Sequence, residues 1–113
     1  MPYYTIPEGL VPSAAKTASG QSDPIEASEY IEGQALLDVT AVSGTNPTLD
    51  VVIETSADKA GWFTHATFSQ KTGTAKDLKL LSNVGKYLRA RWTIGGTTPS
   101  FTFSVALVGK GIR

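Results

Sequence analysis

Apolar and polar residues alternate with a period of two along most of the chain from Gln34 onward. A period of two is the spacing of side chains that point to opposite faces of a β-strand. The segments with this pattern are residues 35–43, 48–55, 62–68, 87–94 and 101–108, and residues 78–81 could form a short strand or a turn. Turn-forming residues recur about every 8–12 positions, so we expect an all-β fold, an antiparallel, jelly-roll-like β-sandwich of about eight strands.

A ten-residue motif occurs twice, 52 positions apart: residues 42–51 read VSGTNPTLDV and residues 94–103 read IGGTTPSFTF. Glycine tolerates positive φ, and proline cannot donate to a β-ladder, so each copy predicts the tip of a β-hairpin between two strands. The two tips could contact one partner or could only set the strand register. In either case we expect them at one end of the sandwich.

The composition of residues 1–24 differs from that of the rest, because this stretch has little charge and four of the six prolines. It predicts an extended N-terminal arm that precedes a β-sandwich domain of residues 25–113. The arm could pack on its own domain or reach a neighbouring subunit. Its apolar anchors are Tyr3, Tyr4, Ile6, Leu10 and Val11. Residues 23–31 could begin a short helix, or residues 28–31 could form a strand.

Charge is divided unevenly, although the net charge is zero. Residues 1–58 hold nine acids and one base, whereas residues 59–113 hold nine bases and one acid. The protein could therefore carry two faces of opposite sign, or strands of the two halves could alternate in space and neutralise one another. The chain has no cysteine, which excludes a disulfide scaffold, a thiol nucleophile and a Cys-ligated zinc site. We expect neither a membrane span nor a signal peptide.

No residue pattern predicts a reactive centre. His65 is the only histidine, and no nucleophile or orienting acid accompanies it in a motif. Asp50 and Glu54 would share one face of a strand, where we expect them to be solvated. Trp92 belongs to the apolar face of its strand and predicts core packing, whereas Trp62 follows a loop glycine and could be partly exposed. We therefore expect no catalytic residues, no metal and no cofactor.

One polar strand face is a candidate binding surface. Tyr87, Arg89 and Arg91 alternate with apolar residues, and Lys86 precedes them. An aromatic ring flanked by arginines can stack bases and pair phosphates, or it can hold acidic side chains of the adjacent strand or of another protein. The acids elsewhere in the chain argue against nucleic acid. Arg89 and Arg91 are therefore predicted interface residues, together with the arm anchors Tyr3, Tyr4, Ile6 and Leu10.

Residues 36–51, together with Tyr87–Ala90 and Trp92–Gly96, resemble a group of small all-β proteins encoded among the structural genes of tailed phages and prophages. The resemblance covers roughly residues 13–110. It implies a virion component that is assembled in the host cytoplasm, is not an enzyme and is a homo-oligomer with no membrane partner. A head decoration (cement) protein that binds the major capsid protein is the leading interpretation. A tail or head–tail connector component and a carbohydrate-binding module are the alternatives.

Overall fold

The computed structural model describes the backbone of residues 3–27, 32–82 and 85–112, and the side chains of residues 9–27, 32–82 and 85–109. These residues form seven antiparallel strands and no helix, which confirms the predicted all-β sandwich. The strands are β1 (Tyr3–Lys16), β2 (Gly20–Gln21), β3 (Ile25–Glu26), β4 (Glu32–Ser56), β5 (Phe63–Thr67), β6 (Ala75–Ser82) and β7 (Tyr87–Ile112).

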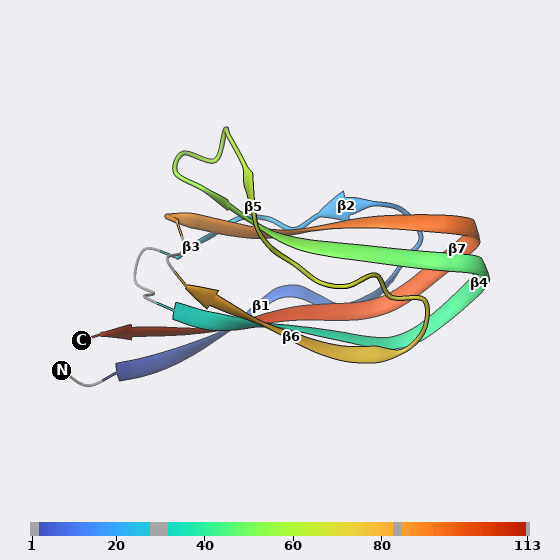
Figure 1. Ribbon diagram of the computed structural model, residues 1–113, viewed down its shortest axis with the longest axis horizontal. Helices are drawn as coiled ribbons and strands as arrows, with labels where there is room; N and C mark the ends of the chain where they lie inside the picture. Colours follow the sequence, from blue (N-terminus) through green and yellow to red (C-terminus); the bar gives the residue numbers. More distant parts are fainter. Residues whose placement is uncertain (1–2, 28–31, 83–84, 113) are drawn as a thin grey trace.

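Strands β4 and β7 are long and bent, and each runs through both layers of the sandwich (Figure 1). In one layer, β7 residues 101–112 pair with β1, and β4 residues 32–43 lie between this part of β7 and β6. In the other layer, β7 residues 87–95 and β4 residues 48–56 pair with each other and are flanked by β2, β3 and β5.

The duplicated motif forms the corner at which both long strands pass from one layer to the other, at the end marked β4 and β7 in Figure 1. The predicted hairpins are therefore wrong, because the two halves of β4 pair with β7 and not with each other. The prediction that both motifs lie at one end of the sandwich is correct. Residues that permit a tight hairpin also permit a strand to change sheets at a bend.

The two copies of the motif adopt matching conformations in the corner. Gly44 and Gly96 have φ values of 113° and 112°, and Asn46 and Thr98 both have φ of 49°. A Cβ on Gly44 would lie 2.7 Å from the carbonyl oxygen of Thr98, and one on Gly96 would lie 2.7 Å from that of Asn46. Each glycine is thus required by its positive φ and by the close approach of the other copy.

The strand pairing also repeats between the two halves of the chain, which are therefore related by an approximate two-fold symmetry. Strands β3 and β1 pair with the first and second halves of β7, and strands β6 and β5 pair with the first and second halves of β4. The chain thus contains a first unit, β1–β4, and a second unit, β5–β7, whose long strands pair with each other and with the short strands of the opposite unit. Because the first unit is acidic and the second basic, this exchange interleaves the two charge halves.

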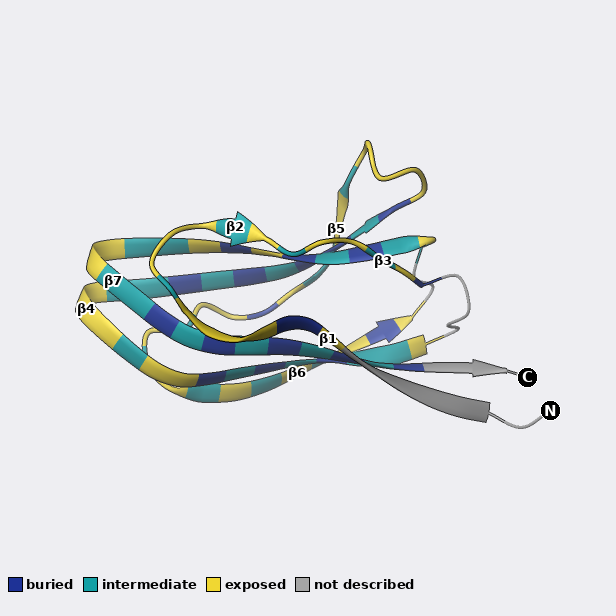
Figure 2. Ribbon diagram, turned by 180° about the vertical axis from the view of Figure 1, so that it is seen from behind, coloured by how far each residue is buried: buried dark blue, intermediate teal, exposed yellow. Residues whose placement is uncertain are grey.

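The alternating apolar residues of the long strands meet between the layers, as the pattern predicted (Figure 2). The core includes Leu37, Val39, Leu49, Val51, Ile53, Leu88, Ala90, Trp92, Phe101, Phe103, Val105 and Leu107. Trp92 packs edge-on against Phe103, with 5.6 Å between the ring centroids, so its predicted core position is confirmed. The alternation shifts at a bulge between Val39 and Ala41, which leaves Ala41 exposed.

The proposed arm is extended, and residues 3–16 form the strand β1 in the sheet of their own chain. Its partners run from Ile112, opposite Tyr3, to Phe101, opposite Lys16. Of the two alternatives left open by the sequence, this is packing on the chain's own domain. The described part of the possible helix is not helical, because residues 25–26 form the strand β3, and the alternative strand of residues 28–31 lies outside the described residues.

Candidate functional site

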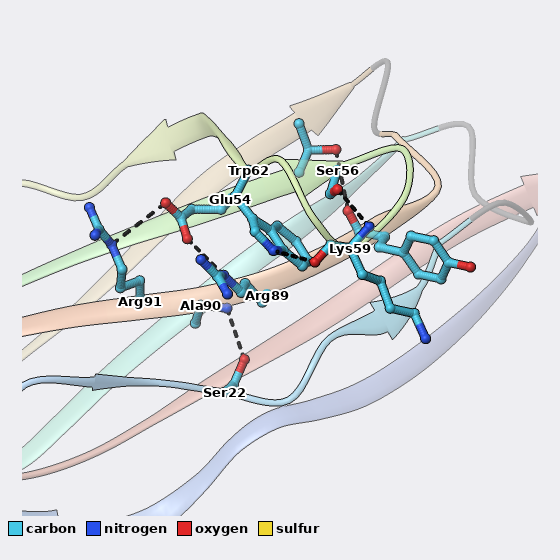
Figure 3. A network of polar contacts seen from close by, with 10 residues as sticks. Ser22, Glu54, Ser56, Lys59, Trp62, Arg89, Ala90 and Arg91 are labelled. Atoms are coloured by element: carbon cyan, nitrogen blue, oxygen red, sulfur yellow. Dashed lines mark hydrogen bonds and ion pairs between the residues drawn. The ribbon is translucent and has the colours of Figure 1, made fainter.

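The outer face of the layer that contains β5 carries an ionic cluster made by neighbouring strands of the two units (Figure 3). Glu54 of β4 stands opposite Arg89 of β7 in the ladder. Its Oε1 accepts a hydrogen bond from Arg89 Nε at 2.8 Å, and its Oε2 lies 3.5 Å from Arg91 Nε. The side chains of Glu54 and Arg89 are only 7% and 15% exposed, whereas that of Arg91 is 53% exposed.

Trp62 covers this ion pair from the loop between β4 and β5. Its ring centroid lies 4.2 Å from Arg89 Cζ, a cation–π contact that shields the guanidinium from water. The indole Nε1–H donates to the carbonyl oxygen of Lys59 at 3.1 Å, which fixes the ring relative to its own loop. Trp62 is half-buried as a result, in agreement with the expectation of partial exposure.

The loop that carries Trp62 is held by two short polar side chains at its start. Ser56 Oγ accepts the N–H groups of Asp58 and Lys59, and Asp58 Oδ1 accepts those of Ala60 and Gly61. These backbone donors, that of Ala60 above all, lower the pKa of the Asp58 carboxyl group below its usual 3.8. These hydrogen bonds fix the conformation of the loop, and the loop holds Trp62 over Arg89.

Tyr87 extends the cluster toward the start of β7. Its ring is approached by Lys59 Nζ at 4.8 Å from the centroid and by Lys86 Nζ at 5.4 Å. Both lysines are exposed, and so is Arg91. The rim of the cluster is therefore cationic, while its centre, Glu54 with Arg89, is internally neutralised.

A second ion pair joins the loop before β6 to β6 itself. Lys71 Nζ donates to Asp77 Oδ2 at 2.7 Å, and both side chains are largely buried. This hydrogen bond is the main reason why the pKa of Asp77 is lowered below 3.8, and the N–H of Leu78, which donates to Asp77 Oδ1, lowers it further. A bridge of 3.1 Å joins Asp38 of β4 to Lys76 of β6, again across the two units.

The candidate reactive groups lie apart in the described structure. His65 sits half-buried on β5, and the described residues contain no cluster of three or more His, Asp or Glu side chains that could hold a metal ion. Glu54 binds arginines, whereas Asp50 accepts from Gln70 Nε2 at 3.1 Å. The expectation that both carboxylates are simply solvated is wrong for Glu54, because the loop with Trp62 covers it.

The predicted interface residues have different positions. The backbone of Tyr3, Tyr4 and Ile6 lies in β1, and their side chains are outside the described residues. Leu10 is buried in the chain's own core. Arg89 is turned to Glu54, and Arg91 keeps an exposed guanidinium. The charge halves meet at this cluster, so of the two interpretations the structure favours mutual neutralisation between strands.

Sequence reasoning missed two exposed apolar residues on β6. Leu78 and Leu80 are 44% and 76% exposed, and they alternate with the partly or fully buried Asp77, Lys79 and Leu81. The period of two through residues 76–81 was the available signal, and it indicates an edge strand with two leucines on its outer face. Beside Leu78 lies an open groove of about 520 Å³, lined by Leu36, Leu37, Asp38, Lys76, Asp77 and Leu78.

Neither a protein family nor a curated protein matches the sequence. Solved structures share the fold. The chain aligns over 96% of its length with the PBSX exported protein XepA, at 17% identity and a TM-score of 0.65, but spans only 37% of the XepA chain. It also aligns over 96% with the SPBc2 prophage-derived protein YomS and 96% of that chain, at 9% identity and a TM-score of 0.55.

Two other kinds of protein have a similar sandwich. The structure of infectious bursal disease virus, Gx strain, matches over 96% of this chain and 32% of its own, with 12% identity and a TM-score of 0.59. The CBM36-1 domain of a multidomain xylanase from the hindgut metagenome of Trinervitermes trinervoides matches over 97% of this chain and 99% of its own, with 10% identity and a TM-score of 0.52. Likeness at these identities shows a β-sandwich fold alone.

Proposed function

We propose that this protein is a non-enzymatic structural component of a tailed-phage virion, and that it acts by binding other virion proteins. In the leading form of the proposal it decorates the head, where it binds the major capsid protein and stabilises the shell. A tail or head–tail connector position is the alternative within the same role.

The observation that carries the proposal is the distribution of chemistry over the surface. The two ion pairs that are largely buried in the described chain, Glu54 with Arg89 and Lys71 with Asp77, are closed within the sandwich. The exposed apolar side chains are instead gathered mostly on the edge strand β6. This distribution suits a protein that binds other proteins better than an enzyme, because the charged side chains are paired within the chain and the leucines face solvent.

The fold likeness supports the virion setting. YomS is prophage-derived by its name, XepA is named as a PBSX exported protein, and infectious bursal disease virus supplies a match from a virus. Strands β4 and β7 run through both layers and therefore join them covalently. A module of this kind can be repeated on a lattice, where many weak contacts add through avidity.

A carbohydrate-binding role is the second candidate, because the CBM36-1 domain shares the fold. Sugar platforms need accessible aromatic faces. Trp92 is in the core, and one face of Trp62 is covered by Arg89. If the protein binds glycans through Trp62, its fluorescence will change across a panel of oligosaccharides; an unchanged spectrum excludes this candidate.

The virion proposal is tested on particles produced by the phage or prophage that encodes the chain. Particles purified through a density gradient should contain the protein in many copies, and gold-labelled antibody should mark them by electron microscopy. Label on the head supports decoration, and label at the neck or tail supports the connector or tail alternative. Absence of the protein from intact particles of all types contradicts the proposal.

A further inference from the structure

The edge of β6 combines exposed apolar residues with a backbone side that no further strand of the described chain pairs with. Among the described residues, Phe63, Leu78 and Leu80 are the exposed large apolar side chains, and two of these three lie on β6. One side of β6 pairs with β4, with Leu78 opposite Leu36, and the described chain places no strand on its other side. An eight-residue edge strand of this kind is a template for a further strand.

The N–H of Leu78 shows which backbone groups of β6 point away from β4. Its N–H donates to Asp77 Oδ1 at 2.8 Å and therefore points away from β4. The N–H and C=O of one strand residue point to the same side, and this direction alternates along the strand. Lys76, Leu78 and Leu80 consequently present their backbone groups to the open edge.

We propose that a second copy of this chain docks on this edge, with the two β6 strands antiparallel and Leu78 of one copy opposite Leu78 of the other. This arrangement joins two four-stranded layers into one continuous sheet around a two-fold axis. The charges and the exposed side chains along β6 favour a second copy as the partner and determine which residues of the two strands lie opposite each other.

Charge complementarity selects the register. With the two Leu78 residues opposite each other, Asp77 of each copy faces Lys79 of the other, which gives two cross-strand pairs of opposite charge. The next registers with the same hydrogen-bonding phase place Lys79 opposite Lys79, or Asp77 opposite Asp77. Both juxtapose like charges directly, which destabilises a strand pair.

The outer face of the joined sheet is complementary as well. In the same register, Leu80 of one copy lies opposite Lys76 of the other, whose side chain borders the groove of about 520 Å³ beside Leu78. Leu80 is the most exposed large apolar side chain of the described residues, and this groove offers it an apolar wall from Leu36 and Leu78. Burial of both copies of Leu80 would remove apolar surface from water.

Docking requires one exchange of hydrogen bonds. The N–H of Leu78 must leave Asp77 Oδ1 and donate to the carbonyl oxygen of Leu78 in the second copy. The Asp77 carboxylate keeps Lys71 at Oδ2 and receives Lys79 of the second copy at the oxygen that becomes free. No buried polar group loses its partner in this exchange.

This proposal deepens the proposed function by naming one contact of the assembly, but its test needs no particle. The mass of the purified full chain is measured by sedimentation equilibrium over a concentration series. The expected species is a dimer with twice the 11.9 kDa monomer mass. A monomer at every concentration overturns the proposal and leaves the virion assignment to the particle experiment.

Surface substitutions then locate the contact. Leu80→Asp should raise the dimer dissociation constant at least about tenfold, and Phe63→Asp, at a similarly exposed large apolar residue on β5, should leave it unchanged. Both positions are exposed, so circular dichroism should show the same fold for each variant. Equal effects of the two substitutions, or no effect of Leu80→Asp, contradict docking at β6.

Single cysteine substitutions can test the register of the two β6 strands, because the chain has no cysteine of its own. Directly opposite residues of a hydrogen-bonded pair have Cα atoms about 5.5 Å apart, within the range of a disulfide. Under mild oxidation Leu78→Cys should therefore form a covalent dimer. Leu80→Cys should not, because the two Leu80 residues would be roughly 14 Å apart. A disulfide at Leu80→Cys with none at Leu78→Cys overturns the register.

Discussion

Replacement of Arg89 by methionine tests how the covered ionic cluster contributes to the sandwich. Methionine keeps much of the apolar stem but removes the guanidinium that binds Glu54 Oε1 at 2.8 Å and lies under Trp62. Glu54 is 7% exposed, so its carboxylate loses its main partner while water remains excluded. The remaining partner, Arg91, has its Nε 3.5 Å from Glu54 Oε2 and is about half exposed to solvent.

The expected cost follows from this geometry. Breaking a buried ion pair by removing one partner costs about 3–5 kcal/mol, and the residual contact with Arg91 brings the expectation to about 3 kcal/mol. Arg91→Met is the matched control on the same strand face. Because Arg91 is 53% exposed and its contact is long, its replacement should cost about 0–1 kcal/mol.

Urea unfolding followed by tryptophan fluorescence measures both free energies of unfolding. Glu54→Gln and the double variant with Arg89→Met complete a double-mutant cycle, which should give a coupling energy of about 2 kcal/mol between the two side chains. Equal losses for Arg89→Met and Arg91→Met, or a coupling energy near zero, would refute the view that the covered pair is a structural element.

Two further predictions concern the corner and the second ion pair. Gly44→Ala and Gly96→Ala should each lower the free energy of unfolding by about 2 kcal/mol or more, and by similar amounts, because both glycines combine positive φ with a close carbonyl oxygen. Urea unfolding measures both losses. An alanine that leaves the free energy of unfolding unchanged at either site contradicts the matched geometry. The pKa of Asp77, followed by carboxyl NMR, should lie below 3.8 and should rise in Lys71→Met, because the Lys71 hydrogen bond is its main cause. A lowered pKa in the folded state means that this contribution to stability is present above the unfolded-state pKa and is lost as the pH falls through the folded-state pKa; an unchanged pKa in Lys71→Met contradicts the assignment.

The core could be predicted from the sequence because burial follows the period of two in each strand. Leu49, Val51 and Ile53 are buried as that pattern indicated, and so are Phe101 and Phe103. The pairing of strands could not be predicted in the same way. A Gly-Thr-Asn-Pro segment favours a change of chain direction, and only contacts with the distant second copy determine whether the result is a hairpin or a corner.

The candidate site shows a similar limit. Alternation placed Arg89 and Arg91 on one strand face, and the structure agrees. Alternation could not show that Glu54 lies opposite Arg89, 35 positions away, or that Trp62 folds over the pair. The charge split in the sequence corresponds to pairing between strands of the two units, since Glu54 of β4 binds Arg89 of β7 and Asp38 of β4 binds Lys76 of β6.

The central proposal is that this β-sandwich acts by binding proteins of a virion. The most direct measurement adds the purified protein back to particles from a phage deleted for its gene and counts bound copies after gradient purification. The account predicts saturable binding of many copies per particle and, for a head decoration protein, greater resistance of the refilled heads to heat. Particles that bind none of the added protein, and that are complete and equally stable without it, would contradict the claim.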